Sequence, residues 1–219
     1  MTTGSRNNAV GGNTMACLEN KEMTMFSKIA TAFTALVFVM MAGCAGKHFV
    51  RPDSGELKNG QTTYDQIVRQ YGKPFREGTV LKNEKMVKTA SYAYASAGGK
   101  SHRGGTAGRS MGFYFLDDIL VGYEFVSSFA DDHTDFDEMK ISSITEGETT
   151  LDEAIKMLGE PSGYYIYPLI ESNFEEAAVY AYSQVKGTFK FKLFQKMLVI
   201  TYDRDRVVTK VEYTSSGSN

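Results

Sequence analysis

The sequence repeats itself, and this duplication limits the fold more than any other feature. Leu57–Asp65 reads LKNGQTTYD, and Ile144–Asp152, which begins 87 residues later, reads ITEGETTLD. The correspondence continues downstream with an offset of 88, where Tyr92-Ala93-Tyr94 matches Tyr180-Ala181-Tyr182. A match that keeps its register over roughly seventy residues indicates a tandem duplication.

Each copy predicts a short helix at its start. Thr62 and Thr149 are the expected N-caps, with Asp65 and Asp152 three residues later in a capping-box-like arrangement. Apolar residues follow at helical spacing, so each helix has one face for a core. These residues are Tyr64, Ile67, Val68 and Tyr71 in the first copy and Leu151, Ala154, Ile155 and Leu158 in the second. Gly72 and Gly159, then Pro74 and Pro161, end the helices, the glycines in a left-handed C′ conformation.

Three strands are expected after each helix. The first copy predicts them at residues 87–96, 111–116 and 119–127, and the second at 177–186, 197–202 and 207–214. The predicted fold class is therefore α+β, with two tandem modules of a helix followed by a three-stranded antiparallel sheet. We place the modules at residues 57–129 and 141–219, joined by a solvated acidic linker at residues 130–140.

The repeated motif resembles that of a known family. Its residues are Gly60, Thr62, Asp65, Gly72 and Pro74 in the first copy and Gly147, Thr149, Asp152, Gly159 and Pro161 in the second. This pattern resembles the BamE (SmpA/OmlA) outer-membrane lipoproteins, and the tandem pair is similar to the β-lactamase inhibitory protein architecture. The resemblance implies a protein-binding role, in outer-membrane assembly for the one-module members. A two-module chain departs from those members.

The N-terminal part predicts a lipoprotein signal peptide at residues 25–43. Its apolar run, Ile29–Ala42, covers about 21 Å as a helix, less than the roughly 30 Å of a hydrocarbon core. The run ends in Met41-Ala42-Gly43-Cys44, which resembles the bacterial lipobox and predicts cleavage before Cys44. An uncleaved anchor, or a chance cysteine after an apolar run, is the alternative. Residues 1–24 fit no export signal, and we expect translation to start at Met23 or Met25.

Lipidation of Cys44 would make it the first residue of the mature chain. Palmitate or similar acyl chains on this residue would anchor the protein, with residues 44–56 as a tether. Cys17 is the second of the two cysteines and would be removed, so no thiol would remain for a disulfide, a nucleophile or a metal site. We expect a lipid-anchored, periplasm-facing envelope protein. Ala45 after the cysteine is compatible with sorting to the outer membrane.

One basic segment is a candidate binding loop. Residues 96–110 are expected to form a mobile hairpin loop that carries Lys100, His102, Arg103 and Arg109. Its Gly98-Gly99-Lys100-Ser101 lacks the first glycine and the following helix of a phosphate-binding loop. The loop is either solvated or docks to an acidic partner or to lipid headgroups.

The remaining motifs give no sign of a metal, a cofactor or catalysis. The acidic run at residues 131–138 lacks the glycine and the spaced glutamate of a calcium-binding EF-hand loop. His48, His102 and His133 have no plausible nucleophile beside them in the sequence. The formal net charge of −2 argues against nucleic-acid binding. We therefore predict no metal, no cofactor and no enzyme activity.

Three functions remain open at this stage. The favoured one is a non-enzymatic module that binds another envelope protein through its sheet surface and loops, in outer-membrane assembly or integrity. The second is a β-lactamase-inhibitor-like binder of a periplasmic hydrolase. The third is a structural envelope lipoprotein without a dedicated ligand.

Overall fold

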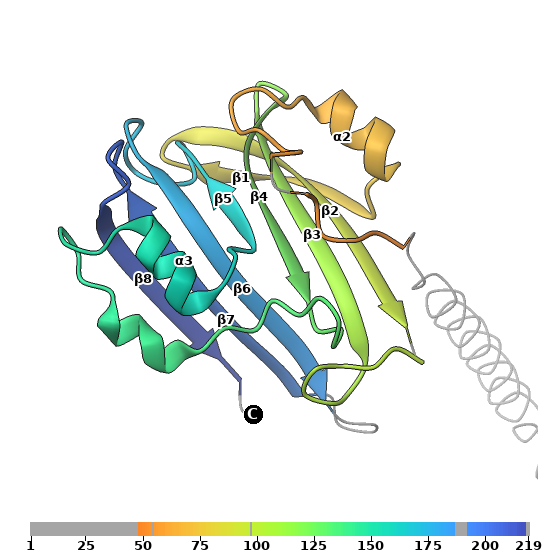
Figure 1. Cartoon of the computed structure of the whole chain (residues 1–219). Helices are drawn as coiled ribbons and strands as arrows, with labels where there is room; N and C mark the ends of the chain where they lie inside the picture. The colour runs from red at the N-terminus through yellow and green to blue at the C-terminus, as the bar shows by residue number, and fades with distance from the viewer. Residues whose placement is uncertain (1–47, 54, 97, 187–191, 218–219) are drawn as a thin grey trace, which may run out of the picture. The chain divides into compact units, whose positions relative to one another are not determined.

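Eight antiparallel strands form one continuous sheet in the order β1-β2-β3-β4-β5-β6-β7-β8 (Figure 1). The computed structural model describes residues 48–53, 55–96, 98–186 and 192–217. The first half of the domain consists of α2 (Tyr64–Tyr71), β1 (Arg76–Lys82), β2 (Lys85–Ser96), β3 (Ala107–Leu116) and β4 (Ile119–Ser127). The second half consists of the 3₁₀ helix η1 (Glu138–Ser143), α3 (Leu151–Leu158), β5 (Gly163–Tyr165), β6 (Glu176–Lys186), β7 (Lys192–Tyr202) and β8 (Val208–Ser216).

The expected pair of helix-plus-three-strand modules is wrong. Each helix is followed by four strands, and the halves join where β4 pairs with β5 through Gly122↔Tyr165, Tyr123↔Tyr164 and Glu124↔Gly163. The polar sequence of β1 lacks an apolar alternation, and β5 is too short to show one. The pairing also has a physical reason, because separate sheets would leave the outer N–H and C=O groups of β4 without partners.

The two helices begin one residue later than expected. Thr63 and Thr150 are the N-caps, and each forms a reciprocal capping box with the residue three positions on, Gln66 and Glu153 respectively. Asp65 and Asp152 are therefore not the capping partners.

Thr62 and Thr149 have another role in the turn before each helix. The hydroxyl oxygen of Thr62 accepts a hydrogen bond from the Lys58 N–H at 2.9 Å, and Thr149 accepts one from Thr145 at 2.8 Å. The repeated threonine pair therefore shapes the turn with its first member and caps the helix with its second.

The repeated glycines take positive φ angles in both halves. Gly60 and Gly147 have φ values of 76° and 79°, and their N–H groups donate to the last strands of their halves. Gly72 and Gly159 end the helices at φ values of 83° and 87°. Their ψ angles of −167° and −175° are extended, so the expected left-handed helical C′ conformation is not formed. These backbone angles favour glycine, because a Cβ atom would be strained there.

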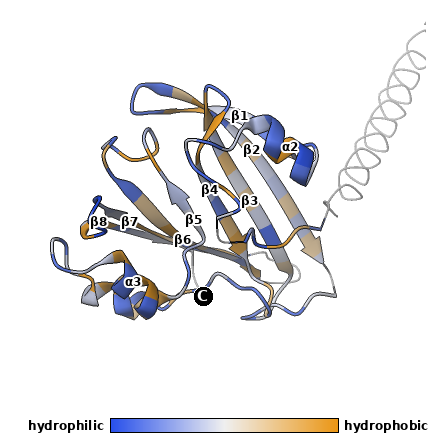
Figure 2. Cartoon of the chain, turned by 45° about the horizontal axis from the view of Figure 1, so that its top comes forward, coloured by the Kyte–Doolittle hydropathy of each residue, from blue (hydrophilic) through white to orange (hydrophobic). Residues whose placement is uncertain are grey.

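Both helices pack on the same face of the sheet. Residues that pair across neighbouring strands share a face, and Phe113, Tyr123, Tyr164 and Ala178 form one such row. Phe113 lies in the core cluster under α2, and Ala178 lies in the core cluster under α3. Figure 2 shows hydrophobic and hydrophilic residues together on α3, as expected for a helix with one buried side. Among the residues that the structure describes, no helix packs on the opposite face of the sheet.

The predicted export segment lies outside the described residues. This applies to residues 1–24, to the signal peptide at residues 25–43 with Met41, Ala42 and Gly43, and to Cys44. Within the part of the chain that the structure describes, no helix has the length and apolar character needed to cross a membrane.

The end of the expected tether packs against the domain. The rings of Phe49 and Phe125 lie 6.4 Å apart, edge to face, and the side chain of Leu57 is buried in the core under α2. Residues 48–53 therefore belong to the folded domain, and a free tether would be shorter than residues 44–56.

Candidate functional site

The face of the sheet opposite the helices is the main candidate surface. One row of paired residues on it is Ser91, Gly112, Glu124, Gly163, Val179, Val199 and Glu212. A neighbouring row is Ala93, Ser110 and Val126, in which Ala93 and Ser110 are exposed. We call the face that carries these two rows the open face. On β2 and β3 this face carries the small residues Ser91, Ala93, Ser110 and Gly112.

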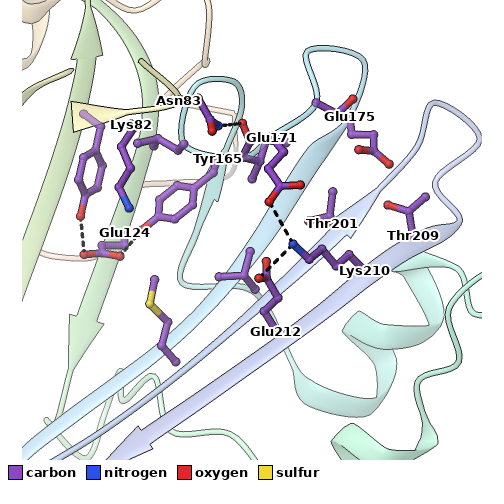
Figure 3. Close-up of a pocket in the computed structure, with 16 residues that line it drawn as sticks. Lys82, Asn83, Glu124, Tyr165, Glu171, Glu175, Thr201, Thr209, Lys210 and Glu212 are labelled. Carbon is purple, nitrogen blue, oxygen red and sulfur yellow. Dashed lines mark hydrogen bonds and ion pairs between the residues drawn. The ribbon is translucent and has the colours of Figure 1, made fainter. Parts of the chain in front are cut away.

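The open face is hollowed where the two halves of the sheet meet (Figure 3). A hollow of about 700 Å³ is lined by Lys82 and Glu124 from the first half and by Tyr165, Lys210 and Glu212 from the second. A second hollow of about 380 Å³ shares Glu124 with the first and extends toward Ser110. We call the larger one the central hollow. Because both halves line it, it exists only in the joined sheet.

Two tyrosine hydroxyls hold the Glu124 carboxylate at the centre of this surface. The Tyr114 hydroxyl donates to Oε1 at 3.1 Å, and the Tyr165 hydroxyl donates to Oε2 at 2.5 Å. Burial, and then the charge of Glu124, raise the pKa of both tyrosines well above the usual value near 10. Both hydroxyls therefore stay protonated at physiological pH and remain donors, so the carboxylate has a fixed orientation.

The loop between β5 and β6 covers one end of the open face. The Asn83 side-chain amide donates to the backbone oxygens of Pro168 at 3.1 Å and Ile170 at 2.8 Å. Ile170 packs with Val179 in a small apolar cluster on this side of the sheet. The β1–β2 turn of the first half thus fixes a loop of the second half, and this loop forms one wall of the central hollow (Figure 3).

Acidic groups outnumber basic groups in the central hollow. Lys210 lies between two carboxylates, with its Nζ atom 3.2 Å from Glu212 and 3.6 Å from Glu171. Glu124 and Glu175 also line the hollow, whereas Lys82 is its one further lysine. The charge balance favours a cationic group over an anionic one in this space.

The predicted basic loop is in large part not a free loop. β3 begins at Ala107, so Arg109 lies in a strand, and its side chain is buried. Its Nε atom lies 2.8 Å from an oxygen of Asp132, and Nη1 lies 3.0 Å from Nε2 of His48. Arg109 is therefore engaged within the domain and does not supply a binding charge at the surface.

His102 and Arg103 are also paired within the domain. Asp135 lies 2.5 Å from Nε of Arg103, 3.5 Å from Nε2 of His102 and 2.7 Å from Nζ of Lys196. The Asp135 side chain is 4% exposed and that of Lys196 is 2% exposed. The expected solvated character of the linker at residues 130–140 is thus wrong for Asp135. Lys100 stays exposed, as expected for a loop residue.

His102 and His133 come together although they lie far apart in the sequence. Their rings stack with centroids 3.6 Å apart. Burial, and then the positive charge that His102 can carry, lower the pKa of His133 below its ordinary value of 6.5. In the described ranges of the chain, no group of three or more histidine, cysteine, aspartate or glutamate side chains is arranged to hold a metal ion.

Sequence reasoning missed the residues that matter most at these sites. Glu124, Tyr114 and Tyr165 carry no motif, and their meeting depends on the β4–β5 junction. Lys196 was not singled out from the sequence, although its charge is buried against Asp135. The period-two alternation of β7 could have indicated its burial, because Lys196 lies on the same side of the strand as Leu198 and Ile200, which face α3.

Comparisons with known proteins give one weak likeness. No family model and no curated protein matches the sequence. The fold is similar to a crystal structure described as a "putative beta-lactamase inhibitor protein" from Streptococcus mutans, with 12% identity and a TM-score of 0.38. The match covers 81% of this chain and 94% of that one. The resemblance to the BamE family gains no support from these comparisons.

Proposed function

We propose that this chain is a non-enzymatic protein-binding module that is anchored to a membrane through lipid on Cys44. In this proposal the open face of the sheet is the surface that takes the partner. The supporting observation is the part of that face on β2 and β3, where the small residues Ala93, Ser110 and Gly112 leave room for another protein's side chains.

The asymmetry between the two faces supports this assignment. α2 and α3 cover one face and complete its core. The other face carries the small apolar cluster of Val179, Ile170 and their neighbours, beside two hollows. A surface that is concave, formed by a rigid sheet and bordered by charged residues suits the docking of a protein.

The charge of the central hollow indicates which group of the partner enters it. Glu124, Glu171, Glu175 and Glu212 face Lys82 and Lys210 there. We expect an arginine or lysine on a protruding loop of the partner to reach Glu124. Because two tyrosine hydroxyls already orient this carboxylate, little conformational freedom is lost on binding.

The arrangement of the polar side chains supports a binding role over a catalytic one. The Asp135 carboxylate is paired with Lys196 and Arg103, and the His102 and His133 rings are stacked on each other. In the described residues, the hydroxyls near these histidines, those of Ser101, Ser127 and Thr134, form hydrogen bonds with other groups. These groups stabilise the linker instead.

The position of the anchor fits this arrangement. The described domain begins at His48, a few residues after Cys44, so a lipidated Cys44 would keep the domain close to the membrane surface. We propose an envelope location facing the periplasm, with the outer membrane as the expected one. A role in outer-membrane assembly or integrity is the version that we favour.

The test compares a substitution on the open face with one on the helix side, and only the open-face substitution should abolish partner binding. Ser110→Arg places a long side chain on the open face, and Lys156→Glu changes an exposed residue of α3. In cells, the wild-type chain and the Lys156→Glu variant should co-purify the same envelope protein, and Ser110→Arg should lose it. Equal recovery by both variants, or equal loss, would contradict the assignment of the open face.

The hydrolase alternative forms a separate arm of this test. If the recovered partner is a periplasmic hydrolase, an equimolar amount of the purified chain should slow its reaction, and the Ser110→Arg variant should not. A partner without hydrolase activity would leave the assembly version standing.

A further inference from the structure

The outer edge of β8 in the second half of the sheet is the counterpart of the β4 edge in the first half, which pairs with β5. In the first half, Gly122–Glu124 of β4 pair with the short strand β5. With the offset of 88, the corresponding residues of the second half are Lys210–Glu212 of β8. β8 pairs with β7 on one side, and no strand lies along its other side in the described residues. The edge of β8 is therefore equivalent to the β4 edge that β5 binds.

In the first half, β1 is the counterpart of β5, the strand that pairs with the edge of β4. β1 pairs with β2 through Arg76↔Ser91 and Glu77↔Ala90, and β5 pairs with β6 through Gly163↔Val179 and Tyr164↔Ala178. These pairs correspond position by position in the two halves. At the other end of the sheet, the outer edge of β1 also has no strand beside it within the described ranges.

We propose that the β8 edge binds the β1 strand of a second copy of this chain, which continues the sheet from one molecule into the next. The register follows from the β4–β5 junction. Lys210 would lie opposite Gly78 of the second copy, Val211 opposite Glu77, and Glu212 opposite Arg76. One position further on, Tyr213 would lie opposite Phe75, as Phe125 meets Ser162 in the observed junction, where the Phe125 N–H donates to the Ser162 oxygen at 2.8 Å.

The side chains that this register brings together are complementary. Glu212 and Arg76 are exposed and of opposite charge, and they would form a cross-strand pair on the open-face side. Phe75 is 68% exposed and Tyr213 is 37% exposed, and both point to the helix side of the sheet. Their pairing would cover Phe75, which the single molecule leaves largely in water, and the exposed part of Tyr213, whose ring also packs edge to face against Phe136.

Glu146 limits this association. Its carboxylate accepts a hydrogen bond from the outward Val211 N–H at 2.7 Å and so occupies the group that an added strand would use. In the first half the corresponding residue is Asn59, whose side-chain amide donates to the Tyr164 oxygen of the docked strand at 3.1 Å. Glu77 of a second copy would also approach the Glu146 carboxylate, and two like charges would repel. The side chain at this position therefore decides whether an edge accepts a strand.

This contact does not rest on the proposed function, because it joins the two edges of the sheet and leaves Ala93, Ser110 and Gly112 uncovered. It does use Glu212, which also lines the central hollow. It joins different surfaces of the two molecules, so each dimer keeps one free β8 edge and one free β1 edge. Such head-to-tail contacts produce longer chains or closed rings as concentration rises.

The first experiment measures self-association of the full chain in detergent solution by sedimentation over a range of concentrations. Glu146→Asn copies the side chain of the first half and should strengthen association about tenfold, because a repulsion is replaced by a hydrogen-bond donor. Arg76→Glu in the Glu146→Asn background should weaken association about tenfold. Adding Glu212→Arg should restore it, since the pair is then reversed. Arg69→Glu, an exposed charge change on α2, is the matched control and should have no effect.

The second experiment locates the contact directly. A photo-reactive phenylalanine derivative at Tyr213 in the Glu146→Asn variant should cross-link to residues 74–77. β1 and β8 are the first and last strands of the sheet, and mixing isotope-labelled with unlabelled chains would show that the link joins two molecules. Absence of association in both the wild-type chain and the Glu146→Asn variant would overturn the proposal. Cross-links to other segments, or no rescue by the reversed pair, would overturn it as well.

Discussion

The buried ion pair of Asp135 and Lys196 provides a quantitative test of the structure. The two charged atoms lie 2.7 Å apart, and both side chains are almost fully buried. Asp135→Ala would leave the Lys196 ammonium group buried without its carboxylate. Removing one partner of a buried pair costs about 3–5 kcal/mol of stability.

The lower end of this range is expected here. Lys196 also donates to the backbone oxygen of Phe136, and its Nζ atom lies 4.4 Å from the centre of the Phe136 ring. These contacts remain in the variant and stabilise part of the charge. We therefore expect Asp135→Ala to lower the free energy of unfolding by about 3 kcal/mol. The double variant Asp135→Ala/Lys196→Met should lose less than Asp135→Ala alone, since no buried charge remains.

The assay is urea unfolding of the purified chain at neutral pH, followed by circular dichroism, with the m-value checked for each variant. The control is Asp131→Ala, because Asp131 is exposed and lies 3.6 Å from Arg109. We expect the control to stay within about 0.5 kcal/mol of the wild type. The buried, coupled pair would be refuted if Asp135→Ala lowered the free energy of unfolding no more than Asp131→Ala does. It would also be refuted if the losses of the two single substitutions added up in the double variant.

Three further predictions concern the sheet junction, the histidine stack and the anchor. Gly163→Ala should destabilise the domain by about 3 kcal/mol in urea unfolding, because the new Cβ would lie 1.8 Å from the Tyr123 oxygen; Gly98→Ala, with open space around it, should be near neutral. The pKa of His133 is lowered in the folded state, so the unfolded chain binds more protons below about pH 6.5 and the free energy of unfolding should fall as the pH decreases through that region. His133→Asn should remove part of that slope, and an unchanged slope would contradict the assignment. Cys44→Ala should abolish flotation of the protein with membranes, and continued flotation would rule out the lipid anchor.

The strands with a clear apolar alternation could be predicted from the sequence. The expected strand at residues 87–96 is β2, and that at residues 177–186 is β6, each with small shifts at the ends. β1 could not be recognised, because its exposed edge position removes the need for an apolar side. β5 has three residues, fewer than a period-two pattern needs. Without these two strands, the sequence leads to two separate sheets.

The candidate site was harder to predict than the strands. The central hollow needs Glu124 from β4 and Tyr165 from β5, and only the missed junction brings them together. The basic residues His102, Arg103 and Arg109 were expected in a mobile binding loop, whereas the structure pairs them with aspartates of the acidic linker. A local charge pattern shows that charges are present, whereas their pairing depends on contacts distant in the sequence.

The central claim is that the open face binds a protein, and site-specific photo-cross-linking in cells tests it most directly. The probe would replace Ala93 or Ser110 on the open face, and Arg69 or Lys156 on the helix side. We predict that both open-face positions cross-link to one and the same envelope protein and that the helix positions do not. Cross-links to that protein from Arg69 or Lys156, with none from Ala93 or Ser110, would contradict the claim.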